Sequence, residues 1–216
     1  MIVKVCGMRD PDNIRAVAEQ VRPDWMGFIC WPDSKRYVAT VPDYLPPPPI
    51  RRVGVFVNPT LEEVLDATQR MGFHLIQLHG SESPAFCLAV KAATGLPLIK
   101  AFSLSCASDL SATEAYLHGE FDGNAQTAAA DYFLFDTRCD TVGGSGRQFD
   151  WELLRTYHGP IPFLLSGGIG PDDASRVQTF SHPLCIGVDV NSRFETNPGI
   201  KDAKALIPFT NTIQTL

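Results

Sequence analysis

Short runs of apolar and β-branched residues recur along the chain, with polar segments between them. Equivalent positions in successive runs lie 21 to 34 residues apart, about the length of one strand followed by one helix. Strands joined by hairpins would be spaced more closely, so the pattern predicts parallel strands with helical crossovers. The eight predicted strands are residues 2–5, 25–29, 52–57, 75–78, 96–99, 132–135, 161–165 and 184–188.

Several segments between these strands have the periodicity of amphipathic helices. Residues 60–71 place apolar side chains at helical spacing behind Thr60, a typical capping residue. Glu62 and Glu63 fall in the first turn of this segment, where the helix dipole favours anions. The other predicted helices are residues 12–20, 83–94 and 198–206.

The alternation of strands and helices from end to end predicts an α/β fold. Eight strand–helix units are the number that closes a (β/α)8 TIM barrel, so we expect residues 1–216 to form one such barrel as a single domain. An open doubly wound sheet is the alternative. Two segments break the rhythm: the proline run 46–49 excludes a regular helix in the second crossover, and residues 119–130 form a predicted surface excursion.

Composition restricts the partners and the location of the protein. The net charge is −6, with 24 acidic against 18 basic residues, so the surface as a whole should repel nucleic acid and anionic lipid. No apolar run approaches the about 20 residues of a membrane span, and the first residues lack a signal-peptide pattern. We therefore expect a cytoplasmic protein with no membrane or nucleic-acid partner.

The cysteines and histidines show no metal-binding or disulfide pattern. The 6 cysteines include no CxxC pair, and the 5 histidines have neither HxH nor HExxH spacing. We expect neither disulfide bonds nor a metal site.

Functional residues of a TIM barrel lie at the C-terminal ends of its strands, so the polar residues after each apolar run are the candidates. Three of these ends are rich in glycine or small polar residues: Gly143-Gly144-Ser145-Gly146, Gly167-Gly168 and Asn191-Ser192-Arg193. Glycine lets backbone N–H groups approach phosphate oxygens closely. One such segment alone would more simply be a tight turn, but three at adjacent strand ends predict a phosphate site.

Cys6 and Asp136 are the titratable candidates at the strand ends. A thiol becomes a general base once a cationic neighbour or a substrate lowers its pKa, and Lys4 lies on the same face of the first strand. A carboxyl group partly shielded from water can hold a proton to donate. Simpler alternatives are open at this point: an inert buried thiol for Cys6, and a helix or turn cap for Asp136.

Motifs spread over the chain resemble one family. They occur in the order found in phosphoribosylanthranilate isomerases of tryptophan biosynthesis, and the likeness extends from about residue 2 to residue 204. The motifs together are more specific than the glycine-rich segments, which suit other phosphate-binding barrels. They are Lys4-Val5-Cys6-Gly7-Met8, Ser34-Lys35-Arg36-Tyr37-Val38, Val53-Gly54-Val55-Phe56-Val57-Asn58, Gln77-Leu78-His79-Gly80 and residues 136–151 and 165–170.

The resemblance implies a metal-independent Amadori rearrangement without a cofactor. N-(5'-phosphoribosyl)anthranilate would become 1-(2-carboxyphenylamino)-1-deoxyribulose 5-phosphate, with Asp136 as the general acid and Cys6 as the general base. Arg36 would bind the anthranilate carboxylate, and His79 would face the substrate or serve a structural role. The small phosphorylated substrate would be the only partner of a monomer or homodimer. The candidate phosphate ligands are Gly144, Ser145, Gly146, Gly167, Gly168, Asn191, Ser192 and Arg193.

The chain departs from the family pattern at Arg193, where a glycine is usual, and at Arg147, where lysine is usual. Two other functions are open. One is a different phosphate-binding barrel enzyme, such as an epimerase or an aldolase-like lyase, with Lys100 as the candidate Schiff-base lysine. The other is a non-catalytic module that binds phosphorylated metabolites.

Overall fold

The computed structural model describes residues 1–117, 119–121, 124–137 and 151–214, and it contains a closed barrel of eight parallel strands. The barrel strands are β1 (Ile2–Val5), β2 (Trp25–Ile29), β3 (Arg51–Phe56), β4 (Leu75–Leu78), β5 (Leu98–Leu104), β8 (Tyr132–Thr137), β9 (Phe163–Leu165) and β10 (Cys185–Val190).

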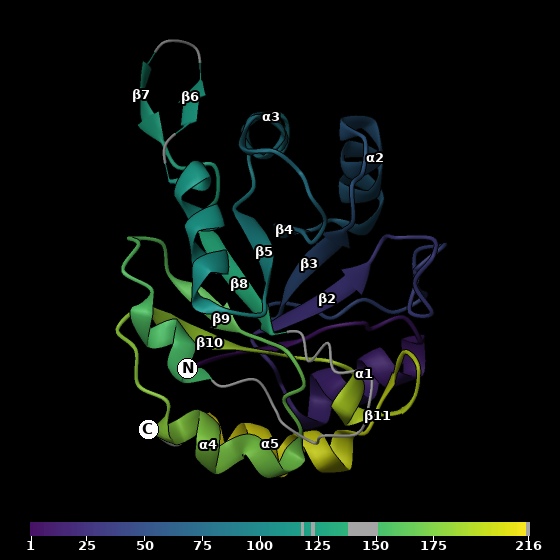
Figure 1. Ribbon diagram of the computed structural model, residues 1–216. Helices are drawn as coiled ribbons and strands as arrows, with labels where there is room; N and C mark the ends of the chain where they lie inside the picture. Colours follow the sequence, from purple (N-terminus) through teal and green to yellow (C-terminus); the bar gives the residue numbers. More distant parts are fainter. Residues whose placement is uncertain (118, 122–123, 138–150, 215–216) are drawn as a thin grey trace.

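The barrel closes between the first and the last of these strands. β1 pairs in parallel with both β2 and β10, so the sheet has no free edge there. The other strands of the barrel, β2 to β5 and β8 to β10, are labelled in Figure 1. The TIM barrel predicted from the spacing is confirmed, and the open doubly wound sheet is wrong. The fifth strand starts later than predicted, at Leu98, because Pro97 precedes it and lacks the N–H that a strand interior needs.

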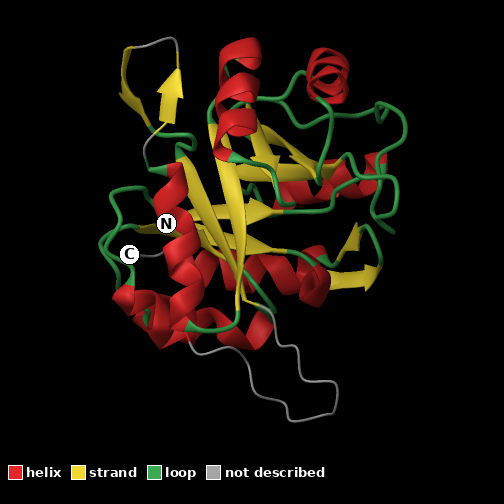
Figure 2. Cartoon of the chain, turned by 45° about the horizontal axis from the view of Figure 1, so that its top comes forward, coloured by secondary structure: helices red, strands yellow, loops and turns green. Residues whose placement is uncertain are grey.

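The helices lie outside the strands (Figure 2). Three of them confirm predicted segments: α1 (Pro11–Gln20), α2 (Leu61–Met71) and α3 (Pro84–Thr94). α2 begins with a capping box, in which the Thr60 hydroxyl accepts from the Glu63 N–H and the Glu63 carboxylate accepts from the Thr60 N–H. It ends at Gly72, whose left-handed φ of 57° suits a residue without a side chain.

The predicted helix over residues 198–206 is wrong in its boundaries. Residues Glu195–Asn197 (β11) and Ile200–Lys201 (β12) form a small antiparallel ladder, and the helix α5 covers Ala203–Gln214. The Asn13 side chain holds Lys201 in the extended form, because it accepts from the Lys201 N–H and donates to the Lys201 carbonyl. This partner lies 188 residues away in the chain, so the local pattern could not reveal it.

The remaining crossovers are irregular. Residues 30–50, all described, contain no helix, as the proline run predicted. The later connections contain the 3₁₀ helices η1 (Ala107–Tyr116) and η2 (Trp151–Thr156) and the short helix α4 (Ala174–Thr179). The predicted surface excursion contains a hairpin of β6 (Gly119–Phe121) and β7 (Asn124–Thr127), which projects from the body of the molecule in Figure 1.

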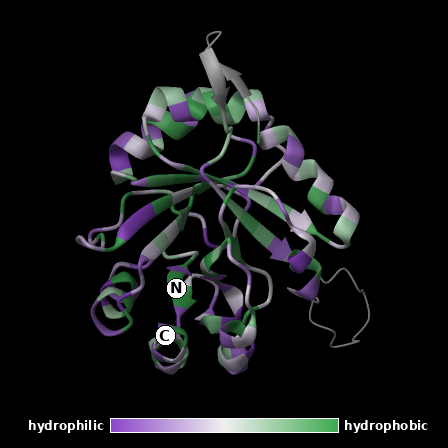
Figure 3. Cartoon of the chain, turned by 90° about the vertical axis from the view of Figure 1, so that its left-hand side faces the viewer, coloured by the Kyte–Doolittle hydropathy of each residue, from purple (hydrophilic) through white to green (hydrophobic). Residues whose placement is uncertain are grey.

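Apolar side chains pack in two layers on either side of the barrel wall. The inner cluster includes Val53, Val55 and Leu75, and a larger cluster fills the space between strands and helices. Figure 3 shows the apolar colour concentrated in the centre and both colours on the outer helices. None of the helices in the described part of the chain combines the length and apolar character of a membrane span.

Candidate active site

A cavity of about 260 Å³ lies at the C-terminal ends of the strands, where a TIM barrel places its functional residues. Cys6 after β1 and Asp136 near the end of β8 both line it, so the two titratable candidates meet in one space. The cavity is lined by Cys6, Ile29, Val55, Val57, Gln77, His79, Asp136, Ser166, Gly167, Gly168, Ile169, Asp189, Asn191, Ser192 and Arg193.

Cys6 lies beside a buried ion pair. Lys4 Nζ donates to Asp189 Oδ1 at 2.7 Å, and the Lys4 side chain is fully buried. Gly27 on the neighbouring strand makes room for this arrangement, because a Cβ there would lie 2.8 Å from Cys6 Sγ and 3.2 Å from Lys4 Nζ. The predicted proximity of Lys4 to Cys6 is confirmed, whereas Asp189 was not among the predicted site residues.

Burial raises the pKa of the Cys6 thiol, and the positive charges of Lys4 and Lys201 oppose this only in part. The cationic neighbour expected from the sequence is present, but desolvation outweighs its effect on the thiol pKa. For Lys4, burial alone would lower the pKa, yet the Asp189 carboxylate and Cys6 outweigh burial and raise the pKa overall. A further positive charge beside Cys6 would favour the thiolate.

We expect Lys4→Met to move the alkylation of Cys6 by iodoacetamide to higher pH. The ammonium stabilises the thiolate, so its removal raises the thiol pKa and delays the reactive form as pH increases. Residue-resolved mass spectrometry across a pH series measures this midpoint. Cys106 is exposed and serves as the internal control, since its midpoint should not move. An unchanged Cys6 midpoint would contradict the role of Lys4.

Asp136 is hydrogen-bonded to a histidine that is itself held by a buried amide. His79 Nε2 lies 3.3 Å from Asp136 Oδ2, and Gln77 Nε2 lies 2.9 Å from His79 Nδ1. With the Gln77 amide nitrogen facing Nδ1 as a donor, His79 directs its Nε2 atom to the carboxylate. The imidazole and the carboxyl group are each about one-third exposed, so both are open to the cavity.

Arg36 lies at the rim of the site, beside Gly7, rather than in the cavity lining. A Cβ at Gly7, whose φ is 78°, would lie 2.6 Å from Arg36 Cδ. The guanidinium donates to both oxygens of Glu195, from Nε at 2.8 Å and from Nη2 at 2.6 Å. Glu195 also accepts from the buried ammonium of Lys201. Glu195 and Lys201 were not predicted as site residues. Glu195 stands at the glutamate of the family's usual stretch after the last strand, which could have marked it, whereas no motif marks Lys201.

The predicted phosphate ligands divide into two groups. Gly167 and Gly168 line the cavity with left-handed φ values of 91° and 66°, a backbone conformation that glycine adopts easily and other residues rarely do. Asn191, Ser192 and Arg193 line it from the loop after β10. Gly144, Ser145 and Gly146 lie outside the described residues.

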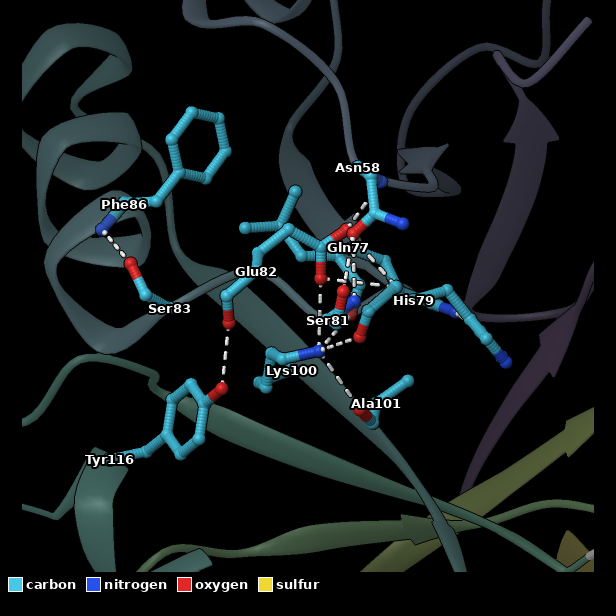
Figure 4. Close-up of polar contacts among 12 residues, drawn as sticks. Asn58, Gln77, His79, Ser81, Glu82, Ser83, Phe86, Lys100, Ala101 and Tyr116 are labelled. Carbon is cyan, nitrogen blue, oxygen red and sulfur yellow. Dashed lines mark hydrogen bonds and ion pairs between the residues drawn. The ribbon is translucent and has the colours of Figure 1, made fainter. Parts of the chain in front are cut away.

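Lys100 does not serve the cavity. It alternates with the inward-facing Ile99 and Ala101 on β5 and therefore points to the helix layer. Its ammonium donates to Glu82 Oε2 at 3.0 Å and to the Gly80 carbonyl at 2.7 Å, and both ionic side chains are 2% exposed (Figure 4). A Schiff-base lysine must present a free amine to its substrate, so this geometry contradicts that role. The pair instead anchors the loop that follows His79.

A family model described as N-(5'-phosphoribosyl)anthranilate (PRA) isomerase matches residues 3–212. The chain belongs to the PRA isomerase family. A relative from Phocaeicola vulgatus, named N-(5'-phosphoribosyl)anthranilate isomerase, is 48% identical over 214 residues, which cover 99% of this chain and 98% of the relative. The resemblance predicted from the motifs is thereby confirmed.

Solved PRA isomerase structures share the fold over the whole chain. The phosphoribosylanthranilate isomerase from Thermotoga maritima has 31% sequence identity and a TM-score of 0.78, with 100% of both chains covered. Another, solved in complex with reduced 1-(o-carboxyphenylamino)-1-deoxyribulose 5-phosphate, has 28% identity and a TM-score of 0.75, again over 100% of both chains. The PRA isomerase fold therefore extends over the entire barrel.

Proposed function

We propose that this chain converts N-(5'-phosphoribosyl)anthranilate into 1-(2-carboxyphenylamino)-1-deoxyribulose 5-phosphate, with Asp136 as general acid and Cys6 as general base. The supporting observation is that these two side chains line one cavity at the C-terminal end of the barrel. Membership in the isomerase family supplies the reaction, and the cavity supplies one proton donor and one proton acceptor.

In the first step, Asp136 donates its proton to the ring oxygen of the ribose. The bond between that oxygen and C1′ breaks, and the nitrogen lone pair forms the C1′=N⁺ double bond of an iminium ion. His79 Nε2 lies 3.3 Å from Asp136 Oδ2, and as an N–H donor it stabilises the negative charge that remains after the transfer. The ring opens without an external electron donor or acceptor.

In the second step, the Cys6 thiolate removes the C2′ proton. The released electron pair forms a C1′=C2′ bond and neutralises the nitrogen, giving an enolamine that tautomerises to the ketone. The iminium charge acidifies the C2′ proton and favours the thiolate, which offsets the burial that raises the pKa of Cys6. Lys4 and Lys201 add to this effect, because both are positively charged groups that lower the pKa of the thiol.

The substrate phosphate is proposed to lie against Gly167 and Gly168. Both glycines line the cavity with left-handed backbone conformations, and Arg193 lines it as well. Arg193 also approaches Gly170, where a Cβ would lie 3.3 Å from its Nε. At position 193 this chain has an arginine where the family usually has a glycine, and the positive charge of Arg193 favours binding of the phosphate.

Loss of substrate fluorescence on addition of the purified chain tests the proposed function. N-(5'-phosphoribosyl)anthranilate is fluorescent, so its conversion to the isomerised product is measured as a decrease in fluorescence. We expect turnover by the wild type without added metal. A chain that binds the substrate but leaves its fluorescence unchanged would support the binding module instead.

We expect Arg36→Met to raise the KM about tenfold or more while kcat changes little. A carboxylate ligand binds the ground state and the transition state similarly, so its loss weakens uniform binding. Steady-state kinetics with N-(5'-phosphoribosyl)anthranilate measure both constants. Lys35→Met on the same loop is the matched control. An unchanged KM in Arg36→Met would remove Arg36 from the substrate site.

A further inference from the structure

Three charged side chains form a connected group across the rim of the site. Arg36 comes from the loop after β2, whereas Glu195 and Lys201 come from the two-stranded ladder after β10. β1 lies between β2 and β10 in the barrel, so the three side chains span the end of β1, close to Cys6. We call Arg36, Glu195 and Lys201 the rim triad.

Glu195 holds one edge of the Arg36 guanidinium. Nε and Nη2 donate to the two carboxylate oxygens, which is the side-on bidentate geometry of an arginine–carboxylate pair. Nη1 has no hydrogen bond to any residue in the described part of the chain. The Nη1–Nη2 edge of the planar fork is thus the edge left for a second carboxylate.

Glu195 is rigidly placed. Its side chain is only 5% exposed, and besides Arg36 and Lys201 it accepts from the Gly199 N–H at 3.1 Å. The Arg36 side chain also packs over Gly7, where any Cβ would collide with it. The guanidinium is therefore oriented before any ligand arrives, and this lowers the entropic cost of binding.

The charge of the rim triad depends on Lys201. Arg36 and Glu195 alone form a neutral pair, which would attract a second carboxylate weakly. The Lys201 ammonium is fully buried against Glu195 and also donates to Asn191 Oδ1 at 2.7 Å, so it neutralises Glu195 and leaves the triad with one net positive charge. That charge matches a monoanionic benzoate group.

From this geometry we infer that Glu195 and Lys201 are specificity-determining positioning residues, which turn Arg36 into a site selective for an aromatic monocarboxylate. Glu195 orients the guanidinium and Lys201 restores its charge, without either residue touching the substrate. The inference rests on the proposed function, because it takes Arg36 as the ligand of the anthranilate carboxylate.

The test compares two substrates that differ only in the carboxylate. N-(5'-phosphoribosyl)anthranilate is measured beside the corresponding aniline derivative, which lacks that group, with wild type, Lys201→Met, Glu195→Asp and Arg36→Met. Glu195→Asp keeps the charge but withdraws the carboxylate by one methylene. Lys204→Met, an exposed lysine on α5, is the matched control for loss of a nearby charge.

We expect Lys201→Met and Glu195→Asp each to raise the KM for the anthranilate substrate about tenfold and to leave the KM for the aniline derivative within about twofold. An effect of Lys201 on Cys6 would change kcat for both substrates. It is therefore distinguished from the expected effect, which is a change in KM for the anthranilate substrate alone. Glu195→Asp should have no further effect on the KM once Arg36→Met is present, because it acts through Arg36.

Two results would overturn the inference alone: equal KM changes with both substrates, or no KM change in Lys201→Met and Glu195→Asp while Arg36→Met loses the discrimination. If Arg36→Met itself keeps the wild-type discrimination, the proposed role of Arg36 fails and the inference fails with it. Thermal unfolding of each variant identifies any that do not fold. Glu195→Asp retains every charge of the buried group and decides the matter if Lys201→Met does not fold.

Discussion

Asp136→Asn is expected to lower kcat by about 10²–10⁴-fold with little change in KM. Asparagine has the shape of the carboxyl group and still accepts from His79, so substrate binding should persist. Its amide N–H is far too weakly acidic to protonate the ring oxygen, so the ring-opening step loses its acid. Cys6→Ser should cause a comparable loss in the second step, because a serine hydroxyl is far less acidic than a thiol and yields almost no oxyanion at neutral pH.

Steady-state kinetics on both variants measure these losses. Asp172→Asn is the matched control, since this exposed carboxylate lies outside the cavity and its kcat should equal that of the wild type. His79→Asn tests whether the histidine beside Asp136 is itself the acid. We expect it to lower kcat less than Asp136→Asn does. If Asp136→Asn and Cys6→Ser both remain as fast as the wild type, the assignment of acid and base is wrong.

Lys100→Met is expected to lower the free energy of unfolding by about 3–5 kcal/mol. The substitution removes the only cation against Glu82 among the described residues and leaves that buried carboxyl group without a charged partner. Lys91→Met is the contrast, because Lys91 and Asp131 are partly exposed and their pair should contribute about 1 kcal/mol or less. Urea-induced unfolding monitored by tryptophan fluorescence measures both.

A double variant, Glu82→Gln/Lys100→Met, should recover part of the stability lost in Lys100→Met, since it no longer buries an unpaired charge. The folded fraction of Lys100→Met should keep a kcat within about threefold of the wild type, because the side chain faces away from the cavity. If borohydride trapped a substrate on Lys100 of the wild type, Lys100 would reach the substrate, and the lyase alternative would be supported.

Local patterns were sufficient wherever one segment determined its own structure. The capping box at Thr60 and Glu63 lies within four consecutive residues, and it starts α2 where the sequence places it. The spacing of apolar runs required a parallel sheet with crossovers, and the number of runs matched a closed barrel. The strand-end rule then brought Cys6 and Asp136 into one cavity without knowledge of any contact.

Predictions failed where a distant partner decided the outcome. Residues 198–206 have helical features, but Asn13 holds Lys201 extended and the helix begins only at Ala203. Lys100 follows an apolar run like the other strand-end candidates, yet the alternation of side chains along β5 turns it to the outer layer, where Glu82 binds it.

The sequence by itself determined the barrel, its family and the identity of the two titratable groups, because periodicity and short motifs act over a few residues. The tertiary structure alone decided the partners of the charged side chains: Asp189 for Lys4, and Glu195 with Lys201 for Arg36. The physical reason is that electrostatic energies depend on distance and burial, and both are set by closure of the barrel, which brings β1, β2 and β10 side by side.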